Sequence, residues 1–171
     1  MFSRLTLLVL AISLTSFANP SITTLRSSAI AAKGATPVYV TRFEGNPDFV
    51  EEATDIFVAR LEAKTQRRII QGDAIRAEGP DIIRGGNIAT RPAGIAAAKA
   101  AGAGLLIVGK VTSHHTSGML NGFVTVRLID TSTGAVLGTV HRPSGMLVGY
   151  SEHQCVLAAS KRVADALSKQ L

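Results

Sequence analysis

The sequence is short of aromatic residues and of cysteine. It has no tryptophan, and aromatic residues make up 5% of the chain. The core must therefore consist mainly of alanine, valine, isoleucine and leucine, which favours close packing of helices on a sheet over large aromatic cavities. The single cysteine, Cys155, excludes a disulfide within one chain. We expect it to be a small buried residue rather than a reactive thiol.

Catalytic patterns are also scarce. Glycoside hydrolysis by paired carboxylates needs two acids that face one cleft, and no such pair stands out in the acid-poor second half of the chain. Ser117 and Ser144 lack the flanking small residues of a nucleophile elbow. His153 lies two residues before Cys155, a spacing at which helical side chains point apart. We therefore expect no enzymatic activity, no catalytic residue and no cofactor.

Positive charge is abundant but not clustered. The chain has 18 lysine and arginine residues against 12 acidic residues, which gives a formal net charge of +6. Only Arg67–Arg68 and Lys161–Arg162 are adjacent basic pairs, and no aromatic residue interleaves with them. This dispersion indicates a solvated basic surface and argues against a nucleic-acid partner. Binding to an acidic glycan stays open as an alternative.

The first residues of the chain contain an apolar run that follows a positive charge. Arg4 precedes Leu5–Leu14, and Ser16 and Ala18 supply small residues before a cleavage site. This pattern is typical of a secretory signal peptide, and the run is shorter than the roughly 20 apolar residues of a membrane-spanning helix. No cysteine follows it, so we expect no lipoprotein anchor and no transmembrane segment after cleavage. The predicted organisation is a signal peptide (1–18), a flexible lead-in with some local order around Ile30 (19–36) and a single domain (37–171).

Hydrophobic periodicity predicts an α/β fold in the order β-α-β-α-β-β-β-α. Helices alternate with strands at first and an antiparallel meander follows, which favours a mixed sheet with helices packed on it and a closing C-terminal helix. The predicted strands are Val38–Phe43, Arg68–Gln71, Leu105–Thr112, Phe123–Asp130 and Val136–His141. The predicted helices are Pro47–Lys64, Pro92–Gly102 and Glu152–Lys169.

Local signals support several of these boundaries. Asn46 is a preferred N-cap residue, and Pro47 suits the first helical position because its missing N–H costs nothing there. Gly102 is a typical left-handed helix stop. Between the last two strands, Asp130 can accept backbone N–H groups in an Asx-type turn, and Gly134 can supply a left-handed residue.

Four histidines raise the question of a metal site: His114, His115, His141 and His153. In a simple hairpin His114 opposes Val124, which then opposes His141. His114 and His141 would share a face with one strand between them, about 10 Å apart, which is too wide for one ion. We therefore expect no bound metal.

The meander resembles a known family of bacterial envelope proteins. Ala101-Gly102-Ala103 with Val108-Gly109 matches one block of the family pattern, and Asp130-Thr131 with Thr133-Gly134 and Leu137 matches the second. The family includes the curli secretion channel CsgG, the synthase activator LpoB and the exopolysaccharide export protein PelC, which share a TolB N-terminal-like fold. Gly104 stands where the family usually has aspartate, and the long strand hairpins of a curli-type pore are missing.

The resemblance implies a non-enzymatic periplasmic accessory or assembly protein, peripheral to the outer membrane, that acts by protein–protein contact. Envelope proteins, and further copies of the chain, are the implied partners. A periplasmic module that binds glycan or a small ligand is the alternative. We expect contact surfaces on the irregular segments Gly72–Arg91 and Pro143–Tyr150, because function concentrates on loops.

Overall fold

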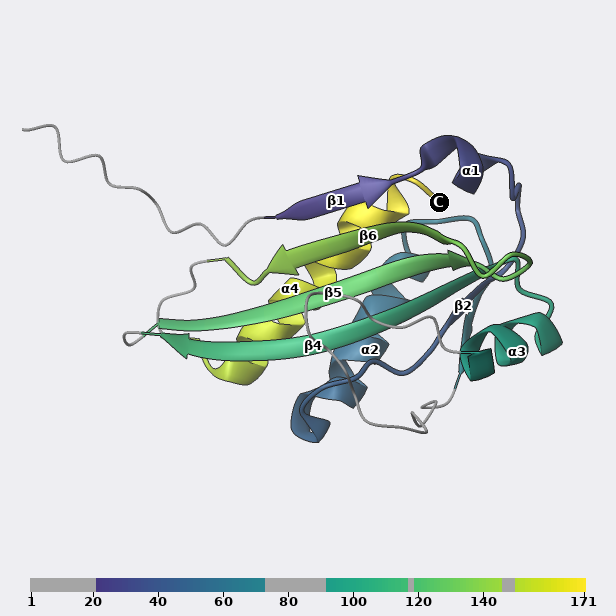
Figure 1. Cartoon of the computed structure of the whole chain (residues 1–171). Coiled ribbons are helices and arrows are strands. Elements are labelled where there is room, and N and C mark those ends of the chain that lie inside the picture. Colours follow the sequence, from purple (N-terminus) through teal and green to yellow (C-terminus); the bar gives the residue numbers. More distant parts are fainter. Residues whose placement is uncertain (1–20, 73–91, 117–118, 146–149) are drawn as a thin grey trace, which may run out of the picture.

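The computed structural model describes residues 21–72, 92–116, 119–145 and 150–171. Within them, six strands form one mixed sheet in the order β1-β6-β5-β4-β2-β3 (Figure 1). The strands are β1 (Ile22–Leu25), β2 (Val38–Val40), β3 (Ile69–Gln71), β4 (Leu105–Thr116), β5 (Met119–Asp130) and β6 (Val136–Pro143). The helices are α1 (Ser27–Ala31), α2 (Pro47–Glu62), α3 (Pro92–Ala100) and α4 (Glu152–Ser168). From β2 onward the predicted element order and the mixed α/β class are confirmed.

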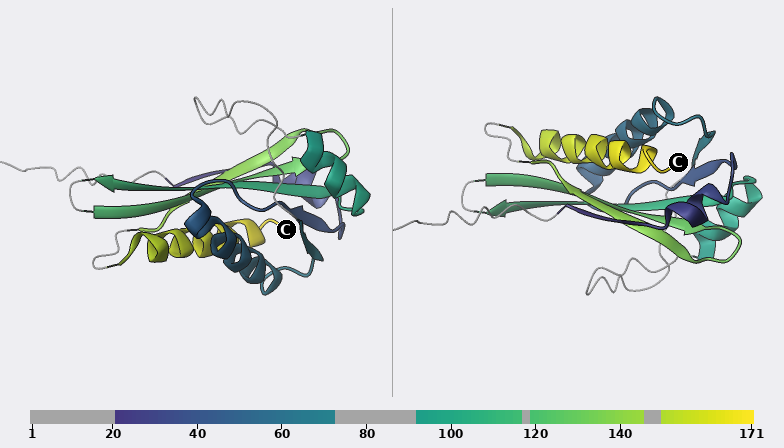
Figure 2. Two further views of the ribbon diagram at one scale, coloured as in Figure 1. Left: turned by 90° about the horizontal axis from the view of Figure 1, so that it is seen from below. Right: turned by 90° about the horizontal axis from the view of Figure 1, so that it is seen from above.

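Helices α2 and α4 pack side by side on one face of the sheet and enclose the main core (Figure 2). Phe57 and Leu61 from α2 and Leu167 from α4 are fully buried there against Ile107 of β4. Each large aliphatic side chain buried in this way contributes roughly 1.5–3 kcal/mol. This layer supplies most of the hydrophobic stabilisation.

The opposite face carries the short helix α3 at one end (Figure 2). Ala98 of α3 packs with Leu106, Val108 and Ile129 in a second, smaller core. Successive residues of a strand point to opposite faces, so β4 contributes to both cores and is buried on both sides. The prediction of a central, two-sided strand at this position is confirmed.

Helix boundaries follow local chemistry. The side chain of Asn46 accepts a hydrogen bond from the Asp48 N–H at 3.0 Å, and Pro47 occupies the start of α2, as predicted. Helix α4 begins at a capping box in which Ser151 and Gln154 satisfy each other's backbone N–H groups. After α3, Gly102 takes a positive φ of 71°, as its predicted role as a helix stop requires.

For residues 19–36 the prediction was a flexible lead-in with some local order around Ile30, and the described part of this segment contains a strand and a short helix. Residues 22–25 form edge strand β1, which pairs with β6 in antiparallel register from Ile22↔His141 to Leu25↔Gly138. Helix α1 follows, and its Ile30 is fully buried in the main core. The segment looks polar because only one face of an edge strand and one turn of helix touch the core. The signal-peptide prediction lies outside the described residues.

The register predicted for the meander also needs correction. The β4–β5 hairpin is longer than expected, so His114 pairs with Asn121 rather than with Val124. An irregularity between Leu128 and Ile129 then shifts β6 by one residue, which places His141 opposite Thr125. A bulge adds one residue to one strand, and no sequence signal marked it. None of the helices in the described ranges is long and apolar enough to cross a membrane.

Candidate functional site

The turn between β5 and β6 is held by Asp130. Its Oδ1 accepts hydrogen bonds from the Ser132 N–H at 2.8 Å and from Lys33 Nζ at 2.6 Å. Burial alone would raise the pKa of Asp130, but these hydrogen bonds and the Lys33 charge hold it well below its ordinary value. The bond from the Ser132 N–H confirms the predicted Asx-type turn, and Gly134 adopts the predicted left-handed conformation with a φ of 73°. Its chemistry is structural, because each partner of the carboxylate belongs to the fold.

Two of the four histidines flank a phenylalanine on the sheet. The His141 ring stacks on Phe123 with ring centres 5.7 Å apart, and His114 contacts the other side of Phe123 at 5.5 Å. His141 Nδ1 lies 2.7 Å from Thr125 Oγ1 in a hydrogen bond. Burial, together with the neighbouring Arg142 charge, lowers the pKa of His141. The aromatic ring separates the imidazoles, so this geometry does not converge on one ion.

The third histidine links the two long helices. His153 Nε2, in the first turn of α4, lies 2.6 Å from Glu52 Oε2 of α2. The imidazole also stacks on Phe49, with ring centres 5.7 Å apart. His153 thus fastens α4 to α2 and faces away from Cys155. The side chain of His115 lies outside the described residues.

Cys155 is completely buried at the start of α4. Gly122 of β5 allows this close approach, because a Cβ atom there would lie 2.5 Å from the carbonyl carbon of Cys155. The thiol is inaccessible in this position, in agreement with the expectation of a small buried residue. Across the described ranges, no group of three or more histidine, cysteine, aspartate or glutamate side chains is placed to hold a metal ion.

The two predicted contact loops are described only in part. Residues 73–91 and 146–149 lie outside the described residues, so the loop predictions are untested there. At the boundary, Ser144 is buried and its N–H donates to Gly122 O at 2.7 Å. Tyr150, by contrast, is 48% exposed.

Sequence comparison finds no relative. No protein-family model matches the chain, and no curated protein matches it. Solved structures do match. The PelC dodecamer from Paraburkholderia phytofirmans is 17% identical, with a TM-score of 0.56 over 87% of this chain and 96% of that chain. A PelC dodecamer with one substitution, from the same organism, is 18% identical, with a TM-score of 0.57 over 88% and 98% of the two chains.

The chain has the PelC fold. The family resemblance inferred from the meander is thereby confirmed at the level of architecture. The LpoB C-terminal domain from Salmonella enterica is 13% identical over 70% of this chain and 94% of that chain, and its TM-score of 0.43 is too low to support an argument. The residues that carry the resemblance explain why it is structural. Gly102 stops α3 before β4, and Asp130 and Gly134 shape the β5–β6 turn of the PelC fold.

Proposed function

We propose that the chain is a non-enzymatic accessory protein of the periplasm, peripheral to the outer membrane. In this proposal it acts through protein–protein contact, as a homo-oligomer, in cell-envelope biogenesis or export. The observation that carries the proposal is the PelC fold, which spans nearly the whole of both chains and whose PelC example is a dodecamer. The signal-peptide pattern at residues 1–18 supports export.

Among the described residues, several side chains of types that could perform chemistry are engaged in the fold, which supports the non-enzymatic part of the proposal. Asp130 bonds to Lys33, Glu52 bonds to His153, and Cys155 is buried. A catalytic acid or base must instead face a bound substrate within hydrogen-bond reach. The glycan-binding alternative is supported only by the net charge of +6.

The domain organisation is part of the proposal. We take residues 1–18 as a signal peptide and the rest of the chain as one domain, whose first described strand is β1 rather than β2. Production of the full chain in a Gram-negative host tests this, by cell fractionation and sequencing of the mature N-terminus. A periplasmic protein that begins at Asn19 is the expected result, and an uncleaved cytoplasmic protein contradicts it.

The homo-oligomer is tested by sedimentation velocity of the purified exported protein over a range of concentrations. We expect a discrete species larger than the monomer. A monomer at every concentration, in low salt as well as in high salt, contradicts this part of the proposal. Chemical cross-linking of intact cells then tests envelope partners, with a strain that lacks the protein as control.

A further inference from the structure

The two flanks of the sheet carry opposite charge. We propose that copies of this chain associate head to tail, with the acidic flank of one copy against the cationic flank of the next. The inference rests on the proposed homo-oligomer and names the surfaces that form it. The supporting observation is charge complementarity between two different surfaces of the same chain.

The cationic flank lies beside edge strand β1. Just after β1, the Arg26 N–H donates a hydrogen bond to Leu137 O. Arg142 of β6 reaches over β1, and its Nη1 donates to Ile22 O at 2.9 Å. The end of α4 reaches the same side, because Ser27 donates a hydrogen bond to Gln170 there. Arg162 of α4 lies beside the end of β6, because a Cβ atom on Gly145 would lie 2.6 Å from its Nη1. Four side chains make up this cationic flank: Arg26, Arg142, Arg162 and Lys169.

These four cations are not neutralised within the chain. Across the residues that the structure describes, none of them forms an ion pair with a carboxylate. Arg26, Arg162 and Lys169 are exposed, and Arg142 is half-buried. On α4, Arg162 and Lys169 are seven residues apart and therefore share one helix face. An acidic partner surface would supply these cations with opposite charges.

The acidic flank lies on the other side of the molecule, along α2. Its members are all exposed and follow helical spacings of three, four and seven residues, so they line one face of the helix: Asp48, Glu51, Asp55 and Glu62. Gln71 Nε2 of edge strand β3 donates to Asp55 Oδ1 at 2.7 Å, which places this face above β3. Arg42 pairs with Glu51 at 2.8 Å and neutralises one of the four acids.

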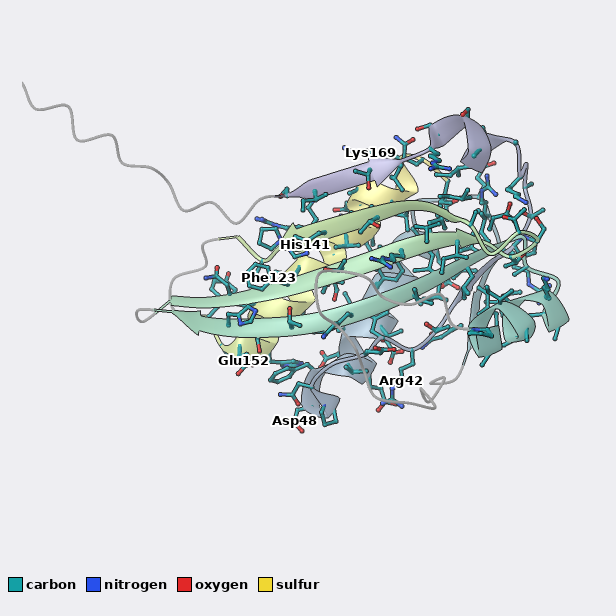
Figure 3. The ribbon with its side chains drawn as sticks, viewed as in Figure 1. Arg42, Asp48, Phe123, His141, Glu152 and Lys169 are labelled. Carbon is teal, nitrogen blue, oxygen red and sulfur yellow. The ribbon has the colours of Figure 1, made fainter. Side chains whose placement is uncertain are left out.

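The two flanks face opposite directions. Strands β1 and β3 are the first and last strands of the sheet, and Figure 3 shows Lys169 and Asp48 on opposite sides of the molecule. A second copy brought in by translation along the sheet would meet the acidic flank of its neighbour with its own cationic flank. Among the described residues, β1 and β3 are each paired on one side only, and an edge strand of this kind can pair with a strand of a neighbouring copy.

The geometry also selects the type of symmetry. In an isologous contact each surface meets itself, which would place cations against cations. A heterologous contact brings the two unlike flanks together and leaves one of each unoccupied, so it propagates until a ring closes. Opposite charge would additionally accelerate encounter at low ionic strength. The inference therefore specifies a salt-sensitive, head-to-tail interface.

Charge reversal tests the interface. The first variant, Arg26→Glu with Arg162→Glu, reverses two of the four charges of the cationic flank and so removes its net positive charge. The second variant, Asp55→Lys with Glu62→Lys, reverses two of the four charges of the acidic flank. It leaves the first turn of α2 unchanged, because a lysine there would oppose the helix dipole. Lys99→Glu with Lys161→Glu is the matched control, because Lys99 lies on α3, on the other face of the sheet, and Lys161 on the outer surface of α4.

Sedimentation velocity at about 0.05 M and about 1 M salt gives the readout, and circular dichroism confirms folding. We expect each double reversal alone to weaken association of the exported full chain by ~10-fold or more, and the control to leave it unchanged. An equimolar mixture of the two reversal variants should assemble again, because the glutamates introduced in one flank then face the lysines introduced in the other. High salt should weaken wild-type assembly.

The homo-oligomer and the assignment of its flanks would be contradicted by different results. A wild-type chain that stays monomeric in all conditions overturns the homo-oligomer itself. A wild-type oligomer that persists in both folded reversal variants, or variants whose mixture does not reassemble, overturns the assignment of these flanks and leaves the homo-oligomer standing.

Discussion

Lys33 Nζ lies 2.6 Å from Asp130 Oδ1, and this ion pair joins two parts of the chain that are 97 residues apart. It ties the turn after α1 to the β5–β6 turn. The Asp130 side chain is only 10% exposed, so its charge depends on partners within the protein. This ion pair helps to explain why the polar segment that precedes β2 packs against the rest of the fold.

Removal of the Asp130 carboxylate should destabilise the fold. We expect Asp130→Ala to lower the free energy of unfolding by about 2–3 kcal/mol, because Lys33 and the Ser132 N–H lose their acceptor in a part-buried site. Asp130→Asn should cost about 1 kcal/mol, since the amide oxygen still accepts from Ser132. Urea unfolding at neutral pH measures both. Equal losses in the two variants would contradict the importance of the backbone hydrogen bond.

Acid should weaken the contact between α2 and α4. The pKa of Asp165 is lowered to about 2, chiefly by hydrogen bonds from Arg60. Partial burial opposes this effect, and a hydrogen bond from Lys64 reinforces it. The folded-state pKa is depressed, so this stabilisation is present above the unfolded pKa of about 3.9 and disappears as pH falls towards 2. Urea midpoints should therefore show a smaller pH dependence between about 4 and 2 in Asp165→Asn than in wild type. An unchanged slope would contradict this account.

The first strand and helix should behave as part of the core. Ile30 is fully buried, so Ile30→Ala should reduce the free energy of unfolding by about 2–5 kcal/mol. Ile22→Ala is the matched control, because Ile22 is 46% exposed and its truncation should cost no more than about 0.5 kcal/mol. Thermal or urea unfolding gives the comparison. If both variants were as stable as wild type, residues 22–31 would not contribute to the stability of the core.

His141 should titrate below the ordinary histidine range. Burial and then the Arg142 charge lower its pKa, which NMR of the imidazole protons can follow directly. Arg142→Ala should raise the pKa of His141 part of the way, whereas the distant Lys161→Ala should leave it unchanged. Because the unfolded state binds the proton more readily, His141 should reduce stability as pH falls through about 6.5. A pKa at or above that value would contradict the described environment.

The elements whose signals are local could be predicted from the sequence. Asn46 and Pro47 predicted the start of α2, and Gly102 predicted the end of α3. Asp130 and Gly134 predicted the β5–β6 turn. Each of these depends on residues within one turn of helix or one tight turn. The same positions carried the family resemblance, which is why it indicated the PelC fold and left the site open.

The features of the candidate interface could not be predicted in this way. Helix spacing makes an acidic face on α2 readable in the sequence, but no local signal indicates that this face lies above β3. Nothing near Arg26 indicated that Lys169, at the far end of the chain, would share its flank. The bulge beyond Leu128 changed the partner of His141 for a similar reason, since register depends on the pairing of whole strands.

The sequence by itself determined the order of elements from β2 to α4, the helix caps and the meander turns, because these follow from backbone preferences and hydrogen bonds between near neighbours. Only the tertiary structure decided that residues 22–25 pair with β6 as strand β1, that Ile30 of α1 is buried in the main core, and that the cations beside β1 and the acids of α2 lie on opposite sides of the sheet. Those properties depend on contacts such as Ser27 with Gln170, 143 residues apart, whose formation is decided by packing of the whole chain.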